Sequence, residues 1–165
     1  MSRRLLIADS GPLIALARLD LLALPKRYFD EIVVSSTFWR EVSRRPRPPE
    51  SERLQAALVQ ANFVVSDSAG CITQQLADAR LDAGERHTVA LGLALEATVM
   101  IDERRGRYIA RELGLPVLGT LGLLVLGRQS GGIPAVKTLI DELQGSGYYL
   151  SDALVEIVLS HFGER

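Results

Sequence analysis

The chain has few of the residues that mark an exported, disulfide-bonded or membrane-spanning protein. Among its 165 residues there is one cysteine, Cys71, which has no second cysteine with which to form an internal disulfide. No export signal is recognisable, because the short apolar run LLIA near the N-terminus is interrupted at once by Asp9. We therefore expect a reducing, cytoplasmic setting. The longest apolar stretch, residues 116–127, is far shorter than the ~20 residues that a membrane helix needs, so we expect buried core there and no membrane partner.

The motifs of zinc sites and of covalent catalysis are also missing. His87 and His161 stand alone, without the His-Glu-x-x-His or Cys-x-x-Cys spacing of a zinc site. No Gly-x-Ser-x-Gly elbow supplies a serine nucleophile. A phosphatase of the Asp-x-Asp type is disfavoured because Gly11 stands where the second aspartate would be. The formal net charge is −1, so a polyanion would have to be bound by local basic patches.

Short runs rich in Val, Ile and Leu alternate with longer helical patterns along the chain. This alternation predicts an α/β fold in which helices connect parallel strands, and the length fits one domain over residues 1–165. The expected strands cover residues 4–8, 31–35, 62–66, 97–101 and 116–118. The expected helices cover residues 12–19, 20–29, 36–45, 50–61, 72–80, 84–96 and 105–113. Three prolines in residues 44–51 predict an exposed turn or short lid, and residues from about 119 to 165 predict a helical C-terminal extension.

Acidic residues recur where the expected strands and helices begin or end. They are Asp9 after the first strand, Glu41 in the helix after the second, Asp82 and Glu85 in the LDAGE motif, and Asp102 after the fourth strand. Open parallel sheets bind ligands beyond the carboxyl ends of their strands, where the strand order reverses. Carboxylates gathered there would repel one another unless a divalent cation held them together. The pattern favours a metal-dependent hydrolase, and oxygen ligands favour Mg²⁺ or Mn²⁺.

Each of these acids also has an ordinary structural explanation. Asp9 precedes Ser-Gly-Pro and could cap a helix, as could Asp102 at the end of its strand. The two acids of LDAGE match a capping box, which needs no metal. Glu41 precedes Arg45 by one helical turn, the spacing of a common surface pair. Glu41 also lies beside the apolar residues Phe38, Trp39 and Val42, where a metal ligand fits better than a surface pair. The recurrence of acids along one expected rim is what favours the metal site over separate structural roles.

Two arginine clusters adjoin these acids. One lies within residues 40–47, and the other, within residues 104–111, follows Asp102 directly. Runs of this kind usually form a solvated face. Because both adjoin candidate metal ligands, they could instead hold the phosphates of a nucleic-acid strand, and we take Arg44, Arg105 and Arg107 as candidate substrate-binding residues.

The order of these motifs resembles the PIN domains, a family that includes the VapC-type toxins of bacterial toxin–antitoxin pairs. The resemblance rests on the aspartate before SGPLIALA, the glutamate of FWREV, the acids of LDAGE and the aspartate of MIDERRGR, and it spans nearly the whole chain. The LDAGE motif and the GTLGLL-to-YYLSD tail resemble a bacterial and archaeal PIN subfamily. The resemblance implies a three-layer α/β/α sandwich with a five-stranded parallel sheet, and a Mg²⁺- or Mn²⁺-dependent ribonuclease that forms homodimers and is paired with an antitoxin.

Carried over residue by residue, the resemblance assigns roles to the acids. Catalysis falls to Asp9, Glu41, Glu85 and Asp102, and metal binding to the same four with Asp82. The third acid of the family is commonly an aspartate opening a helix, whereas Glu85 stands here with Asp82 just upstream, so either could be the direct ligand. Ser10 matches a small hydroxyl residue that would orient a carboxylate or phosphate. The alternative is a catalytically silent PIN-like module that binds RNA or a partner protein in the same groove.

Overall fold

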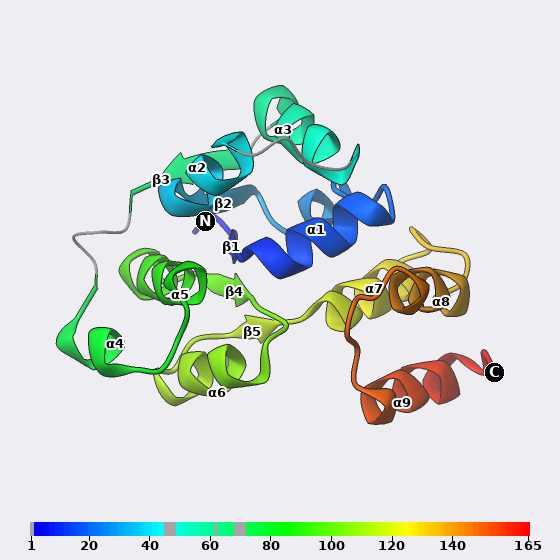
Figure 1. Ribbon diagram of the computed structural model, residues 1–165. Helices are drawn as coiled ribbons and strands as arrows, with labels where there is room; N and C mark the ends of the chain where they lie inside the picture. Colours follow the sequence, from blue (N-terminus) through cyan, green and yellow to red (C-terminus); the bar gives the residue numbers. More distant parts are fainter. Residues whose placement is uncertain (1, 45–48, 62, 68–71) are drawn as a thin grey trace.

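The computed structural model describes residues 2–44, 49–61, 63–67 and 72–165, and a five-stranded parallel sheet runs through its centre (Figure 1). The strands are β1 (Leu5–Ala8), β2 (Glu31–Ser35), β3 (Phe63–Ser66), β4 (Thr98–Met100) and β5 (Val117–Leu118). Their order is β3-β2-β1-β4-β5, and each neighbouring pair is parallel. With helices packed on both faces, the predicted α/β/α sandwich is confirmed.

Helices connect the strands and continue beyond the last one. They are α1 (Ser10–Arg18), α2 (Ser36–Arg44), α3 (Pro49–Ala61), α4 (Gln74–Asp78), α5 (Ala83–Leu95), α6 (Arg104–Glu112), α7 (Thr120–Gln129), α8 (Lys137–Gly145) and α9 (Asp152–Phe162). The predicted helix at 20–29 is wrong over most of its length. Only a 3₁₀ turn, η1 (Leu24–Arg27), forms there, because Asp20 adopts a left-handed φ of 56° and Pro25 lacks the N–H that a longer helix needs. Cys71 and residues 45–48 of the predicted proline-rich turn lie outside the described residues.

Alternate side chains of the central strands enter two separate cores. Leu6 of β1 belongs to the core formed with α1, α3 and α7, whereas the next residue, Ile7, belongs to the core formed with α4, α5 and α6. Ile32 and Val33 of β2 divide between the two cores in the same way. Successive strand residues point to opposite faces, so a sheet covered on both sides needs apolar residues at every position. This is why the strand sequences are continuous apolar runs.

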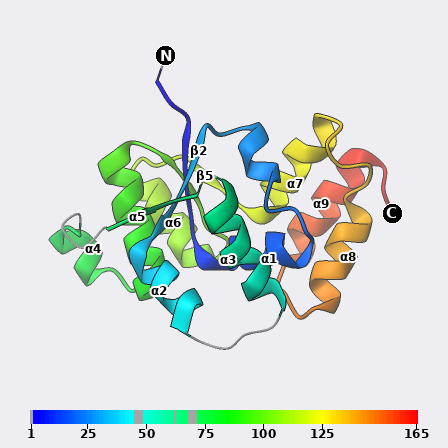
Figure 2. The same cartoon turned by 90° about the horizontal axis from the view of Figure 1, so that it is seen from above.

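Helices α7, α8 and α9 gather at the end of the molecule that holds the C-terminus (Figure 2). Leu124 of α7 and Ile140 of α8 are buried in the same core as α1. The segment after α9 is tied down by Glu164, whose carboxylate accepts hydrogen bonds from Nε of Arg128 at 3.0 Å and from the backbone N–H of Val136 at 2.7 Å. In the part of the chain that the structure describes, no helix combines the length and apolar character needed to cross a membrane.

The strand order reverses between β1 and β4. The chain builds β2 and β3 on one side of β1 and then returns to place β4 on the other side. The backbone N–H of Asp9 donates to the carbonyl oxygen of Met100 at 3.0 Å, so the two strands remain paired up to their carboxyl ends. These two strands therefore flank the switch point of the sheet. This is the position at which open α/β sheets bind ligands.

Candidate active site

Three aspartates lie near one another beyond the carboxyl ends of β1 and β4. Asp9 directly follows β1, Asp102 follows β4, and Asp82 precedes α5. A side-chain carbon added at Gly84 would be 3.4 Å from Oδ1 of Asp9 and 3.4 Å from Oδ1 of Asp82, so both carboxylates flank this glycine. The charges of Asp82 and Asp102 both act on Asp9. The strand and helix ends therefore bring these three acids to one rim.

Asp9 is a nearly buried carboxylate, with 9% of its surface exposed. Burial raises the pKa of its carboxyl group to about 6, and repulsion from Asp82 and Asp102 adds to the rise, while the N–H of Ser10 and the hydroxyl of Thr88 oppose it. Asp9 occupies the N-cap position of α1, but its side chain makes no capping hydrogen bond. Side-chain capping therefore does not explain an acid at this position.

Asp102 is held in place by three hydrogen-bond donors. Its Oδ1 accepts from the backbone N–H of Thr120 at 2.7 Å, and its Oδ2 accepts from the Thr120 hydroxyl at 2.5 Å and from the Tyr148 hydroxyl. Burial and the Asp102 carboxylate raise the pKa of Tyr148, so its hydroxyl stays protonated and donates. The N-cap of α6 is Glu103, whose carboxylate accepts from the N–H of Gly106 at 2.8 Å. Asp102 is thus oriented by donors from elsewhere in the chain and does not cap the helix.

The sequence did not reveal either side chain that holds Asp102. Thr120 begins α7 and follows β5, the strand that pairs with β4. A polar residue after β5 lies at the same end of the sheet as Asp102, so the strand pattern could have indicated Thr120. Tyr148 lies in the connection between α8 and α9. It is 46 residues from Asp102, and no motif in the sequence links the two.

The LDAGE motif forms the predicted capping box. Oδ1 of Asp82 accepts from the N–H of Glu85 at 2.8 Å, and Oε2 of Glu85 accepts from the N–H of Asp82 at 3.2 Å. Glu85 is 6% exposed, and its burial, together with the charges of Asp82, Glu103 and Asp9, raises the pKa of its carboxyl group to about 7. Capping therefore accounts for these hydrogen bonds, while the buried position of Glu85 places a second protonatable carboxyl group beside the three aspartates.

Comparison with known families agrees with this geometry. A family model described as a PIN domain matches residues 5–164. The chain belongs to the PIN-domain family. PIN domains are generally nucleases and typically use divalent metals. A search of curated proteins found no match.

The other predicted site residues of this PIN domain lie on α1, α2 and α6. Glu41 is an exposed residue of α2, a helix that packs against α5. Ser10 opens α1, and Arg105 is exposed in the first turn of α6. The Arg107 guanidinium donates to the carbonyl oxygen of Ile101 at 3.1 Å, and burial lowers its pKa. The Arg44 side chain lies outside the described residues.

The acidic side chains at this site of the PIN domain suit a hard divalent cation, both in ligand type and in charge. Carboxylate oxygens are the preferred ligands of such ions, and a cation would offset the burial and the repulsion that raise the pKa of Asp9. Within the ranges that the structure describes, no three His, Cys, Asp or Glu side chains lie close enough together to hold one ion. Mg²⁺ commonly takes only one or two carboxylates and completes its shell with water and substrate phosphates. The residues therefore fit an ion held by few direct protein ligands.

Proposed function

We propose that this PIN domain is a Mg²⁺- or Mn²⁺-dependent endoribonuclease that hydrolyses RNA phosphodiester bonds, and that it is the toxin of a cytoplasmic toxin–antitoxin pair. The observation that carries the proposal is Asp9, a buried carboxylate without a capping role that lies beside Asp82 and Asp102 at the switch point. Such an arrangement costs folding free energy when no ion is bound. Cation binding explains why three acids converge there.

Asp9 and Asp102 are the direct metal ligands in this proposal, and Asp82 or Glu85 supplies a further ligand, directly or through water. Glu41 completes the catalytic set from α2. Thr120 and Tyr148 hold the Asp102 carboxylate through the hydrogen bonds described above. A bound cation would activate a water molecule, orient the scissile phosphate and stabilise the leaving oxygen. The chain itself contributes placement and charge, with no covalent intermediate.

Basic and hydroxyl residues at the same rim are the proposed substrate contacts. Arg105 is exposed in the first turn of α6, and Ser10 follows Asp9. Arg44 is proposed from its place in the sequence, after Glu41. Arg107, whose guanidinium donates to the carbonyl oxygen of Ile101 at the end of β4, is the fourth proposed substrate contact. We further propose that the chain acts as one domain and as a homodimer, with an antitoxin protein as its partner.

A catalytically silent PIN-like module is the second candidate. It is favoured by the capping box, which accounts for the hydrogen bonds of Asp82 and Glu85 without a metal. It is also favoured by the spacing of the acids, since no described group of three is poised to hold one ion. In this case the groove would bind RNA or a partner protein, and the domain would not cleave.

Cleavage of RNA by the purified full chain, with Mg²⁺ or Mn²⁺ and with EDTA, tests the proposal. We expect cleavage only with the metal, and its loss in Asp9→Asn and Asp102→Asn. The matched control is Asp141→Asn, an exposed aspartate of α8 that pairs with Lys137. RNA binding without cleavage in either metal would favour the silent module. Activity that persists in EDTA or in both site variants would overturn the metal-dependent reaction.

A further inference from the structure

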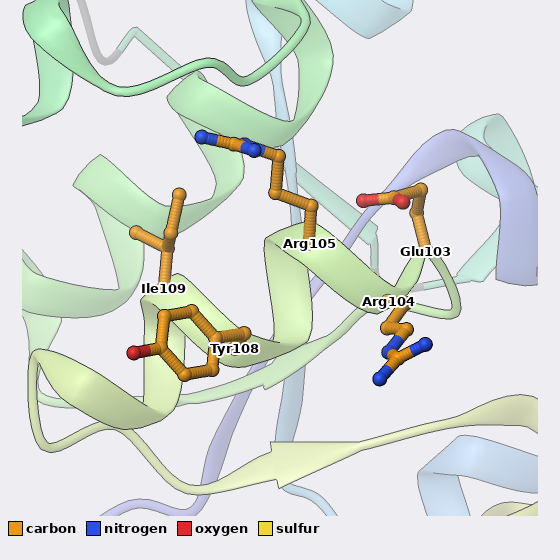
Figure 3. Close-up of a pocket in the computed structure, with 5 residues that line it drawn as sticks. All are labelled: Glu103, Arg104, Arg105, Tyr108 and Ile109. Atoms are coloured by element: carbon orange, nitrogen blue, oxygen red, sulfur yellow. The ribbon is translucent and has the colours of Figure 1, made fainter.

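A hollow of about 420 Å³ lies along α6 (Figure 3). The residues that line it are Glu103, Arg104, Arg105, Tyr108 and Ile109. Residues four apart lie on the same side of a helix, so Arg104 and Tyr108 share one side of α6 and Arg105 and Ile109 share another. Figure 3 shows these two pairs projecting in different directions from the helix. The hollow therefore combines two cations with an aromatic ring and an aliphatic side chain.

The hollow begins at the rim of the candidate active site. Glu103, which lines it, follows Asp102 in the chain and interacts with Glu85 of the carboxylate cluster. Tyr108 lies five residues farther along α6, roughly 7.5 Å at the helical rise of 1.5 Å per residue. A strand whose phosphate lies at Asp102 could thus place its neighbouring nucleotides along the hollow.

The lining has the chemistry of a single-stranded nucleic-acid site. Tyr108 is 62% exposed, so the face of its ring is accessible to a planar ligand. Arg104 and Arg105 are both exposed beside it. Exposed aromatic rings on which bases stack, next to cations that follow the phosphates, are the usual elements of single-strand binding. The hollow is less suited to binding an apolar peptide, because three of its five lining residues are charged.

We propose that the hollow along α6 binds unpaired nucleotides next to the scissile bond, with one base stacked on Tyr108 and the adjacent phosphates on Arg104 and Arg105. The inference rests on the proposed function and adds to it a base-stacking subsite at Tyr108, flanked by Arg104 and Arg105. Bases within a duplex are stacked on both faces and are not available to Tyr108, so a double-stranded RNA cannot use this contact.

Binding is tested in the full chain carrying Asp9→Asn, in EDTA, so that cleavage does not interfere. The probe is a fluorescein-labelled single-stranded RNA, alone or annealed to its complement. Tyr108→Ala should weaken binding of the single strand about 10-fold, whereas Tyr108→Phe, which keeps the ring, should bind like the parent. The matched control is Tyr149→Ala, which removes a tyrosine that is 85% exposed between α8 and α9. It should leave binding unchanged.

Two further measurements separate stacking from general attraction. A series of RNAs, each with one base removed, should contain one that binds parent and Tyr108→Ala equally, because the base that stacks is gone. Arg104→Gln should make the plot of log binding constant against log salt concentration less steep, by about the contribution of one phosphate contact. Arg3→Gln is the control for Arg104→Gln. Arg3 precedes β1, at the amino ends of the strands and away from the candidate site, and pairs with Glu31 at 3.1 Å.

The outcomes distinguish this inference from the proposed nuclease activity. A Tyr108→Ala variant that binds single-stranded RNA as tightly as Tyr149→Ala does, or that loses equal affinity for both RNA forms, overturns the inference. If the parent binds single strands through Tyr108 but cleaves nothing with Mg²⁺ or Mn²⁺, the inference stands and the nuclease proposal fails. If the parent cleaves RNA and Tyr108→Ala leaves KM unchanged, the nuclease proposal stands and the inference fails.

Discussion

Asp9 and Glu85 are buried acids whose folded-state pKa values lie above those of an unfolded chain. The values are about 6 against 3.8 for Asp9 and about 7 against 4.5 for Glu85, and burial is the main cause of both. The folded chain therefore binds more protons than the unfolded chain between about pH 4 and pH 7, so the free energy of unfolding falls as the pH rises through this window. For one such group, a pKa difference of about two lowers the free energy of unfolding by roughly 3 kcal/mol at neutral pH. A bound cation would offset this cost.

Replacing Asp9 by Asn should therefore change stability in a pH-dependent way. Without metal, Asp9→Asn should melt several degrees above the parent at pH 8, where the parent carries the buried charge, and close to it at pH 4. Mn²⁺ should raise the melting temperature of the parent at pH 8 and have little effect on the variant. Thermal melting at both pH values, with EDTA or Mn²⁺, measures this. A parent–variant difference that is the same at pH 4 and pH 8 would contradict the assignment of a raised pKa to Asp9.

Tyr148→Phe isolates the contribution of one hydroxyl group to the placement of Asp102. The variant keeps the ring and loses the hydrogen bond to Oδ2, while both contacts from Thr120 remain. Residues that orient a metal ligand typically contribute 10- to 100-fold to metal affinity. We expect cleavage to require about 10-fold more Mn²⁺, with KM for RNA unchanged.

The Mn²⁺-induced rise in melting temperature gives a readout of Tyr148→Phe that is independent of activity. It should require a higher Mn²⁺ concentration in Tyr148→Phe than in the parent. Tyr149→Phe, at an exposed position next in the chain, is the matched control. The same Mn²⁺ dependence in Tyr148→Phe and Tyr149→Phe would show that the hydroxyl has no part in holding Asp102 for the metal.

Helix α5 carries the candidate ligand Glu85 and is capped by Asp82, and its distance from the sheet depends on a small residue. A side-chain carbon at Gly92 would lie 2.5 Å from Cγ1 of Val99 and 3.1 Å from Cδ1 of Leu115. Alanine is favoured over glycine by about 1 kcal/mol inside a helix, but overpacking a core typically costs 1–3 kcal/mol. We therefore expect Gly92→Ala to destabilise the protein.

Denaturant unfolding measures the effect of Gly92→Ala. Gly145→Ala, at the end of α8, is the matched control, because a side-chain carbon there meets no atom within 4 Å. It should be neutral or stabilising. Adding Val99→Ala, which removes the atom that clashes, should recover part of the stability lost in Gly92→Ala. Equal effects of the two glycine replacements would rule out close packing of α5 against β4 as the cause.

At the scale of elements, the sequence predicted what local patterns determine. The strands were found because parallel strands covered on both faces are continuous apolar runs, as in LLIA of β1. The capping box was found because its two partners are only three residues apart. The helix expected at 20–29 does not form because Asp20 is left-handed and Pro25 has no N–H, and neither effect is visible in an apolar pattern. Capping was also proposed for Asp9, whose side chain makes no such hydrogen bond, since a sequence does not show where a side chain points.

At the scale of the molecule, the candidate site combines predictable and unpredictable parts. The meeting of Asp9 and Asp102 followed from a general rule, since both end strands that flank the reversal of strand order. The surroundings of Asp102 did not, because Thr120 and Tyr148 reach it from 18 and 46 residues away through the packing of α7 and of the α8–α9 connection. The C-terminal helices therefore contribute to the site as well as to the core.

The exposed side of α9 is the candidate surface for self-association of the chain. Leu154 is 49% exposed and Ile157 is 64% exposed, and residues three apart lie on the same side of a helix. Val155 and Val158, by contrast, pack against the core. Exposed apolar side chains that lie together often mark contact surfaces, and a two-fold dimer is the commonest homo-oligomer. We expect α9 to pair with α9 of a second copy.

Sedimentation measures this prediction directly. The parent should sediment as a dimer at micromolar concentration, and the double replacement Leu154→Glu with Ile157→Glu should give a monomer, because two buried glutamates in a shared apolar interface have no partners. Leu95→Glu, at a leucine of α5 that is 40% exposed, is the matched control and should remain dimeric. The melting temperature of the double variant reports whether its fold persists, which is expected because neither side chain is buried in the single chain. A parent that sediments as a monomer at high micromolar concentration would contradict the dimer, and a double variant that still dimerises would place the interface elsewhere.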